Sequence, residues 1–165
     1  MAITKIDDMK SSKAAQIKRE VFVVHGHNSQ LRDAVALFLT RLGLEPIILH
    51  EQVNAGATII EKLEKHSRRA GYAIILLTAD DIGCSKAESS TAVRPRARQN
   101  VIMELGLFIG LLGRERVSII HDEGIELPSD INGLLYTAHY PAGHWRISIA
   151  KEIKSGGLSV DLNRL

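Results

Sequence analysis

One carboxylate stands inside an apolar helical stretch of this sequence. Glu104 lies between Val101 and Leu112, where apolar residues recur at the period of an α-helix. An ionised glutamate is rarely buried without a cationic partner, and none of the positions three or four residues away is basic. Two interpretations stay open: an ion pair across the fold with an arginine such as Arg96 or Arg98, or a functional carboxylate in a partly apolar cleft.

Three arginines, Arg94, Arg96 and Arg98, precede this stretch and alternate with other residues. Guanidinium groups near a helix N-terminus suit an anionic ligand such as a pyrophosphate. They would serve equally as solvated surface charges, and the pattern favours neither interpretation.

Two histidines, His25 and His27, flank Gly26 after the first β-branched run. They could ligate a metal, but no cluster of cysteines or carboxylates completes a ligand set, so we expect no metal. His25 is either a strand-end residue that bonds to backbone or a contact for substrate. The turn lacks the Gly-x-Gly-x-x-Gly pattern of a dinucleotide-binding loop, and no Walker phosphate loop is present.

A pair of aspartates, Asp80 and Asp81, follows the third apolar run. The pair is similar to the acidic end of the third strand in a receiver domain. No lysine at the end of a fifth strand completes that phosphorylation site, so we reject this interpretation. We expect one aspartate to cap a loop and the other to line the cleft.

Hydrophobic periodicity predicts the elements that position these groups. Apolar or β-branched runs predict strands at 21–24, 46–49, 72–77, 117–120 and 134–136. Helical periods predict helices at 31–42, 58–70, 101–112 and 143–154, the first capped by Asn28 or Ser29 and ended by Gly43. A long polar loop is expected between Asp81 and Val93, a short turn or helix at 128–133, and a tail at 161–165.

Strands that alternate with helices predict an α/β fold with a flavodoxin-like, doubly wound sheet of about five mainly parallel strands. The helix that carries Glu104 is expected to be buried around much of its circumference, because Leu107 and Leu111 widen its apolar face.

Ligands bind such sheets at the carboxyl ends of the strands, near the topological switch point. The loops expected there are 25–29, 50–57, 78–98 and 121–130, and the helix with Glu104 begins from the same edge. The substrate-binding candidates are the following residues of these loops and of the start of that helix: His25, Gly26, His27, Asn28, Asn54, Gly56, Thr78, Asp80, Asp81, Arg96, Arg98 and Asn100.

The bulk composition predicts one globular domain. The 165 residues are 45% hydrophobic and 24% charged, which argues against disorder and allows a real core. Residues 1–20 are polar and charge-rich, so we expect an arm or linker before a domain at 21–165. The net charge of +2 gives no reason to expect nucleic acid as a partner.

Three further observations favour a cytoplasmic location. A single cysteine, Cys84, cannot form an internal disulfide and fits a reducing compartment. No apolar run approaches the roughly 20 residues of a membrane span. The N-terminus lacks the apolar core of a signal peptide.

Several ordered blocks carry a resemblance to a known family. They are Val-Phe-Val-Val-His-Gly-His-Asn at 21–28, Ile-Leu-His-Glu-Gln at 48–52, Thr-Ile-Ile-Glu-Lys at 58–62, Leu-Leu-Thr-Ala-Asp-Asp at 76–81, Arg-Gln-Asn-Val-Ile-Met-Glu-Leu-Gly at 98–106 and Leu-Pro-Ser-Asp-Ile-Asn-Gly at 127–133. Together they resemble the bacterial TIR-like family once described as predicted nucleotide-binding proteins. Its members include TIR effector domains fused to STING-type or cyclic-nucleotide sensors in anti-phage systems, and the resemblance covers residues 21–165.

The resemblance implies a TIR fold and an enzyme that hydrolyses NAD⁺ to nicotinamide and ADP-ribose, with NAD⁺ as substrate and no cofactor. The family's catalytic glutamate maps onto Glu104. Family members act as homo-oligomers or filaments through TIR–TIR contacts. No sensor domain is attached to this chain, so either the effector acts alone, a partner supplies the sensing, or the chain is an excised fragment.

The chemistry agrees with a single glutamate. Nicotinamide leaves from a cationic pyridinium, so no acid has to protonate it, unlike the leaving oxygen in ordinary glycoside hydrolysis. Glu104 could stabilise the oxocarbenium charge, hold the ribose hydroxyls or attack C1′. Two rivals remain: a non-catalytic TIR scaffold that assembles through residues 54–57, and a nucleoside deoxyribosyltransferase, which resembles this fold and also uses a glutamate.

Overall fold

A parallel five-stranded sheet forms the centre of the described chain. The computed structural model describes residues 19–48, 61, 70–87, 92–131, 136–139 and 143–165. The spatial order of the strands is β2-β1-β3-β6-β7, and every neighbouring pair is parallel. The strands are β1 (Glu20–Val24), β2 (Glu45–Ile47), β3 (Tyr72–Leu77), β6 (Val117–His121) and β7 (Tyr136–Ala138). The predicted flavodoxin-like α/β fold is therefore confirmed.

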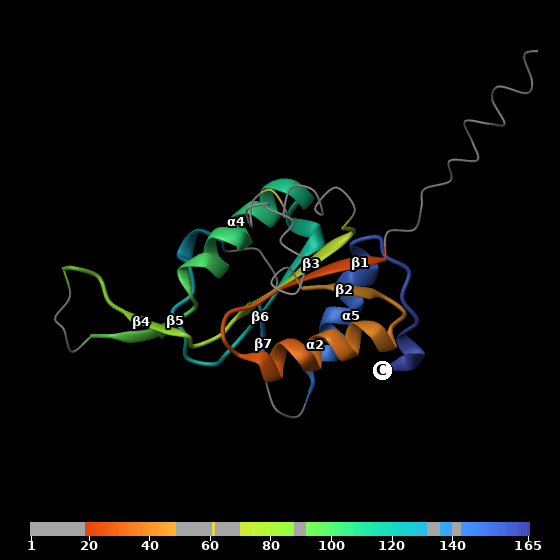
Figure 1. Cartoon of the computed structure of the whole chain (residues 1–165), viewed down its shortest axis with the longest axis horizontal. Helices are drawn as coiled ribbons and strands as arrows, with labels where there is room; N and C mark the ends of the chain where they lie inside the picture. Colours follow the sequence, from red (N-terminus) through yellow and green to blue (C-terminus); the bar gives the residue numbers. More distant parts are fainter. Residues whose placement is uncertain (1–18, 49–60, 62–69, 88–91, 132–135, 140–142) are drawn as a thin grey trace, which may run out of the picture.

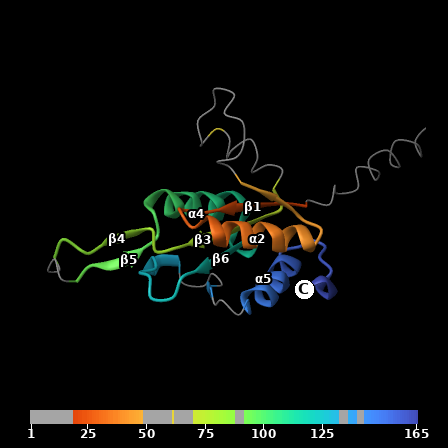
Figure 2. The same ribbon diagram turned by 60° about the horizontal axis from the view of Figure 1, so that its bottom comes forward.

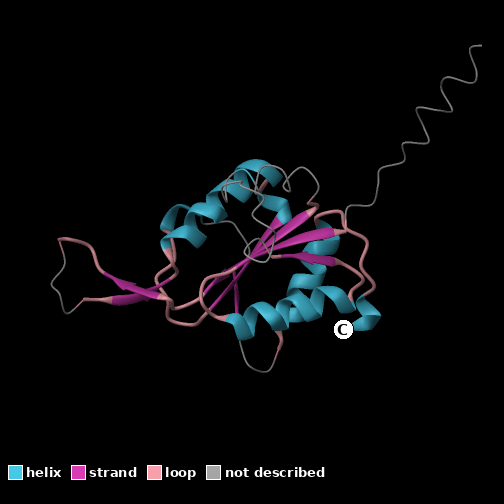
Figure 3. Ribbon diagram, in the orientation of Figure 1, coloured by secondary structure: helices cyan, strands magenta, loops and turns pink. Residues whose placement is uncertain are grey.

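Helices cover both faces of this sheet. Helix α4 (Gln99–Leu112) lies on one face, and α2 (Ser29–Arg41) and α5 (Trp145–Ser155) lie on the other (Figures 1 and 3). The central strands are buried along almost their whole length, so alternate residues serve the two cores. On β1, Val21 and Val23 pack with α2 and α5, while Phe22 and Val24 pack with α4.

Aromatic contacts mark the two cores. The rings of Phe22 and Phe108 lie 4.8 Å apart on the α4 side, and those of Phe38 and Trp145 lie 5.1 Å apart on the α2–α5 side. These distances are within the range of favourable ring pairs. The two cores therefore hold α4 and α2 against the same strands. They also determine where the N-termini of both helices lie relative to the edge of the sheet.

Helix α2 follows its predicted signals closely. The Asn28 side chain accepts a hydrogen bond from the Leu31 amide at 3.0 Å, which confirms Asn28 as the helix cap. Gly43 has a φ of +79°, a left-handed conformation that favours glycine after a helix.

Helix α4 is buried along a narrower stripe than predicted. Its buried residues are Val101, Glu104, Leu105, Phe108 and Leu112. Leu107 is partly buried and packs beside the core, but Leu111 is 43% exposed. The prediction of burial around much of the circumference is therefore wrong. A helix on a sheet contacts it along one stripe, and apolar residues outside that stripe stay at the surface.

A two-stranded ribbon replaces part of the predicted polar loop. Strands β4 (Asp81–Gly83) and β5 (Arg94–Arg96) pair antiparallel, and the ribbon extends away from the main sheet (Figures 1 and 2). Each strand has three residues and no apolar alternation, so periodicity could not reveal it. The Glu126 amide donates to the Pro95 carbonyl at 2.8 Å, which ties the ribbon to the loop after β6.

Several boundaries differ from the prediction by a few residues. Strand β7 begins at Tyr136, whereas the predicted strand covers 134–136, of which 134 and 135 lie outside the described residues. A short 3₁₀ turn, η2 (Arg114–Arg116), follows α4. A second, η3 (Ser129–Ile131), lies where a short turn or helix is predicted, and a third, η4 (Leu162–Arg164), lies in the expected tail. Three predicted segments lie wholly or mostly outside the described residues: residues 1–18 of the arm predicted at 1–20, the loop predicted at 50–57, and most of the helix predicted at 58–70. Glu20, at the end of the predicted arm, begins β1.

Candidate functional site

The sheet has its topological switch point between β1 and β3. From β1 the chain first adds β2 on one side and later β3 on the other. The loops after β1 and β3 therefore separate at this point, where doubly wound sheets bind ligands. They carry six of the predicted substrate-binding residues: His25, Gly26, His27, Asn28, Thr78 and Asp80.

Asp80 joins these two loops. Its Oδ1 accepts the His27 amide at 3.1 Å, and its Oδ2 accepts the Thr78 hydroxyl at 2.8 Å. The Asp80 side chain is 7% exposed, and its bond to Thr78 is partly buried, whereas its bond to the His27 amide is at the surface. A Cβ on Gly26 would lie 1.7 Å from the Asp80 Oδ2, and only glycine permits this approach. The prediction that one aspartate caps a loop is confirmed for Asp80.

Arg98 extends this network to α4. Its Nη1 lies 3.3 Å from the His27 Nε2, so the guanidinium donates and the imidazole nitrogen accepts. The His27 Nδ1 in turn lies 3.9 Å from the Asp80 Oδ1. Arg98 is also the residue before α4, and its side chain makes no capping bond to the helix. The chain Asp80–His27–Arg98 thus connects the ends of β1 and β3 to the start of α4.

Glu104 is the buried ionisable group of α4. It is 4% exposed, and burial raises its pKa from 4.5 to about 7, although the Arg98 charge opposes the rise. No ion pair or hydrogen bond of Glu104 occurs within the described part of the chain. A direct ion pair with Arg96 or Arg98, one of the two predicted alternatives, is therefore not formed. Burial therefore favours the neutral form of this carboxyl group, compared with a glutamate in water.

The other predicted residues divide into several groups. His25 donates from Nδ1 to the Gly26 carbonyl at 2.8 Å, as expected of a strand-end histidine. Asp81 pairs in register with Arg96 inside the ribbon. The prediction that the second aspartate lines the cleft stays a prediction. Asn100 is exposed in the first turn of α4. Asn54 and Gly56 lie outside the described residues.

Asp122 belongs to this edge, although no residue of its loop is among the predicted candidates. Its Oδ2 accepts the Ala79 amide at 3.1 Å, and its Oδ1 lies 3.9 Å from the His139 Nδ1. Asp122 therefore links the ends of β3, β6 and β7. The sequence does contain a signal that could have identified Asp122: an aspartate that follows a buried strand, as Asp80 does.

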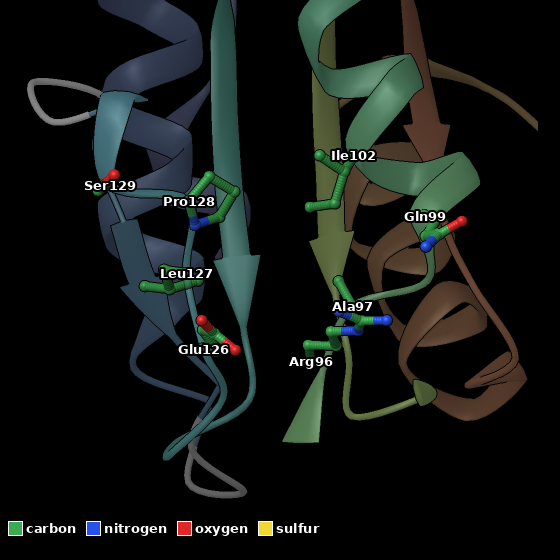
Figure 4. Close-up of a pocket in the computed structure, with 8 residues that line it drawn as sticks. All are labelled: Arg96, Ala97, Gln99, Ile102, Glu126, Leu127, Pro128 and Ser129. Atoms are coloured by element: carbon green, nitrogen blue, oxygen red, sulfur yellow. The ribbon is translucent and has the colours of Figure 1, made fainter. Parts of the chain in front are cut away.

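Two pockets open near the same edge, one on each side of the sheet. A pocket of about 480 Å³ lies between the start of α4 and the loop after β6, and Arg96 lines it (Figure 4). A pocket of about 380 Å³ lies between the starts of α2 and α5, and Asn28 and His139 line it. The described residues contain no group of three or more His, Cys, Asp or Glu side chains arranged for a metal. They also contain no helix with the length and apolar character to span a bilayer.

The strand order and the switch-point network define a flavodoxin-like α/β domain with a ligand-binding edge. Residues 20–140 match the model of the family described as CAP12/Pycsar effector protein, TIR domain. This match covers most of the chain, and the chain belongs to that TIR domain family. The predicted resemblance to bacterial TIR effector domains is confirmed.

Relatives in several organisms are similar to this chain. YuaY of Escherichia coli is 43% identical over 148 residues, which are 90% of this chain and 49% of that protein. Protein tirC of Dictyostelium discoideum is 38% identical over 125 residues, 71% of this chain and 62% of that protein. The Pycsar effector protein PaPycTIR of Pseudomonas aeruginosa is 38% identical over 77 residues, 46% of this chain and 24% of that protein. The chain thus spans only part of the length of these relatives.

Proposed function

We propose that this domain cleaves the N-glycosidic bond of NAD⁺, and that Glu104 is its catalytic carboxylate. The observation that carries the proposal is a carboxylate that is 4% exposed and lacks an ion pair within the described chain. Folding alone gives no reason for such a residue, because an apolar side chain would fill the position at no electrostatic cost. A perturbed carboxyl pKa at a ligand-binding edge is typical of a functional group.

The reaction needs little more than electrostatic stabilisation. The bond between the nicotinamide nitrogen and C1′ breaks, and its electron pair returns to the pyridinium ring, so nicotinamide leaves neutral. The ribose becomes an oxocarbenium ion, to which water adds at C1′ with loss of a proton. An ionised Glu104 would stabilise the positive charge that develops on the ribose, and in many enzymes electrostatic stabilisation of the transition state accounts for most of the rate enhancement.

The Asp80–His27–Arg98 network would bind the rest of the dinucleotide. Arg98 offers a cation beside the start of α4, where no side chain caps the helix. A pyrophosphate there would meet both the guanidinium and the helix N-terminus. Asp80 would act indirectly, because its bonds to His27 and Thr78 hold the two loops together.

We also propose a role as an effector in bacterial anti-phage defence, activated by assembly into homo-oligomers with signals from a sensor domain or a sensor protein. Support comes from the family and from relatives named Pycsar effector protein and CD-NTase-associated protein 12, the latter from Sphingobacterium faecium at 37% identity over 75 residues, 46% of this chain and 22% of that protein.

The test compares Glu104→Gln with Glu115→Gln, the same change at an exposed position. Each protein is incubated at high concentration with a crowding agent and NAD⁺ or a deoxynucleoside, and the free base is measured by chromatography. We expect Glu104→Gln to release nicotinamide at least about 100-fold more slowly than the wild type, with an unchanged circular dichroism spectrum. Glu115→Gln should release nicotinamide at the wild-type rate.

Wild-type-like release by Glu104→Gln would refute the role of Glu104. Base release from deoxynucleosides alone would indicate a deoxyribosyltransferase instead. An assembled wild-type protein that releases no base from either substrate would indicate the non-catalytic scaffold.

A further inference from the structure

The larger pocket lies on the flank of α4 opposite to Glu104. Ile102 lines the pocket, whereas Glu104 does not. The two residues are two positions apart, and side chains at this spacing point about 200° apart around an α-helix. Ile102 and Glu104 therefore project from different sides of the first half of the same helix, and the pocket lies on the side of Ile102.

The walls of the pocket are held in place by backbone contacts. Arg96 forms an isolated parallel bridge with Glu126, and the Glu126 amide donates to the Pro95 carbonyl at 2.8 Å. Ile125, beside them, is buried in the core under α4. The strand before α4 and the loop after β6 are thus joined beside the pocket by backbone contacts.

Two opposite charges line the pocket without pairing. Arg96 and Glu126 are neighbours in the backbone, yet neither forms an ion pair within the described part of the chain. Gly83 leaves room for the guanidinium, since a Cβ there would lie 2.4 Å from the Arg96 Cζ. The Nε of Arg96 is buried against Gly83 and is not offered to the pocket. Arg96 and Glu126 are the charged residues of the lining.

The remaining walls are mainly apolar. Ile102 points into the space from α4, and Leu127 and Pro128 face it from the loop after β6 (Figure 4). These side chains could cover the two faces of a flat ring. The volume of about 480 Å³ is within the range of small-molecule sites and has room for a nucleoside.

We propose that this pocket binds the base of a purine nucleotide that carries an exocyclic amino group. The amino group would donate to the Glu126 carboxylate, and a ring nitrogen or carbonyl oxygen would accept from a terminal guanidinium nitrogen of Arg96 rather than from its buried Nε. The ring would lie between Ile102 and the Leu127–Pro128 segment. This assigns a function to the Leu-Pro-Ser block at 127–129, which the proposed cleavage reaction leaves unexplained.

Binding of AMP, GMP and UMP to the purified chain, measured by isothermal titration calorimetry, tests this site. Ile102→Arg places a long cation inside the pocket, and Met103→Arg makes the same change at the next, 51% exposed position. We expect AMP or GMP to bind the wild type and Met103→Arg alike, and Ile102→Arg to lose saturable binding. Glu126→Ala should weaken binding about tenfold, because a hydrogen bond to a charged group is lost. UMP, which lacks the amino group, should bind more weakly by a similar factor.

The proposal would be overturned if neither purine nucleotide binds, if UMP binds as well as AMP and GMP, or if Ile102→Arg binds like the wild type. The Glu104→Gln variant separates this site from the proposed reaction, and it should bind the purine nucleotide normally while releasing no nicotinamide. Binding that is lost in Glu104→Gln but kept in Ile102→Arg would place the base near Glu104 and refute the pocket. Normal purine binding by a wild type that never cleaves NAD⁺ would support the pocket and refute the cleavage proposal alone.

Discussion

Replacing Glu104 with glutamine should stabilise the fold, and more so at higher pH. The wild-type carboxyl group has a pKa of about 7 in the folded protein, compared with an ordinary value of 4.5. A raised folded pKa means that the folded state binds the proton more tightly than the unfolded state. The stability of the wild type therefore falls as pH rises from about 4.5 to about 7, and above that range the full cost of the buried carboxylate is present.

The size of the effect follows from the shift. A rise of the pKa from 4.5 to about 7 lowers the free energy of unfolding by about 3 kcal/mol at pH 8, but by only about 1 kcal/mol at pH 5. Glutamine has nearly the same shape and no charge, so it removes this pH-dependent cost. The difference in unfolding free energy between Glu104→Gln and the wild type should then grow by about 2 kcal/mol between pH 5 and pH 8.

Urea unfolding at the two pH values, followed by circular dichroism and extrapolated to water, measures this difference. Glu115→Gln is the matched control, and it should stay within about 0.5 kcal/mol of the wild type at both pH values. A difference between Glu104→Gln and the wild type that does not change with pH would show that Glu104 ionises alike in both states. The reasoning about a buried carboxylate that has no ion pair among the described residues would then be refuted.

Two further predictions concern the network beside Glu104. Arg98→Gln removes the charge that lowers the Glu104 pKa. The pH at which kcat/KM for nicotinamide release rises should therefore move to a higher value. A pH profile identical to that of the wild type would contradict this coupling. Gly26→Ala places a methyl group against Asp80 and should cost about 2 kcal/mol in thermal or urea unfolding. Gly110→Ala on α4, where a Cβ meets nothing within 4 Å, should instead be neutral or stabilising, and equal effects at the two glycines would argue against the close approach.

The main elements could be predicted because their signals are local. The third strand is predicted at 72–77 and is found at Tyr72–Leu77, since a continuous apolar run bounded by glycine and threonine has few alternatives. Helix α2 begins after the expected cap and ends before the expected glycine. The ribbon of β4 and β5 could not be predicted because its pairing depends on contacts between residues more than ten positions apart, which periodicity does not record.

The candidate site could be predicted only in part, for a related reason. Membership of the edge follows from topology, so His27, Thr78 and Asp80 are expected there. Their partners depend on distances that the sequence does not contain. The bond between Arg98 and His27 joins residues 71 positions apart, and the tie between Ala79 and Asp122 spans 43 positions. The pocket beside Arg96 is likewise invisible in the sequence, because its second wall comes from a loop that follows β6.

Two features of this edge are difficult to explain by folding alone, and they occur together. A stable helix favours a capping side chain at its start, yet Arg98 makes no such bond. A stable core favours an apolar residue at position 104, yet a carboxylate is buried there. Both choices lower stability, and they leave a helix end and a charge near the switch point. Gly26 differs from them, because its contact with the Asp80 carboxylate is part of the fold. A ligand with a positive ribose centre and an anionic diphosphate would compensate the charges at Glu104, Arg98 and the helix N-terminus. We therefore expect substitutions at this edge, rather than in the exposed ribbon, to affect function before they affect the fold.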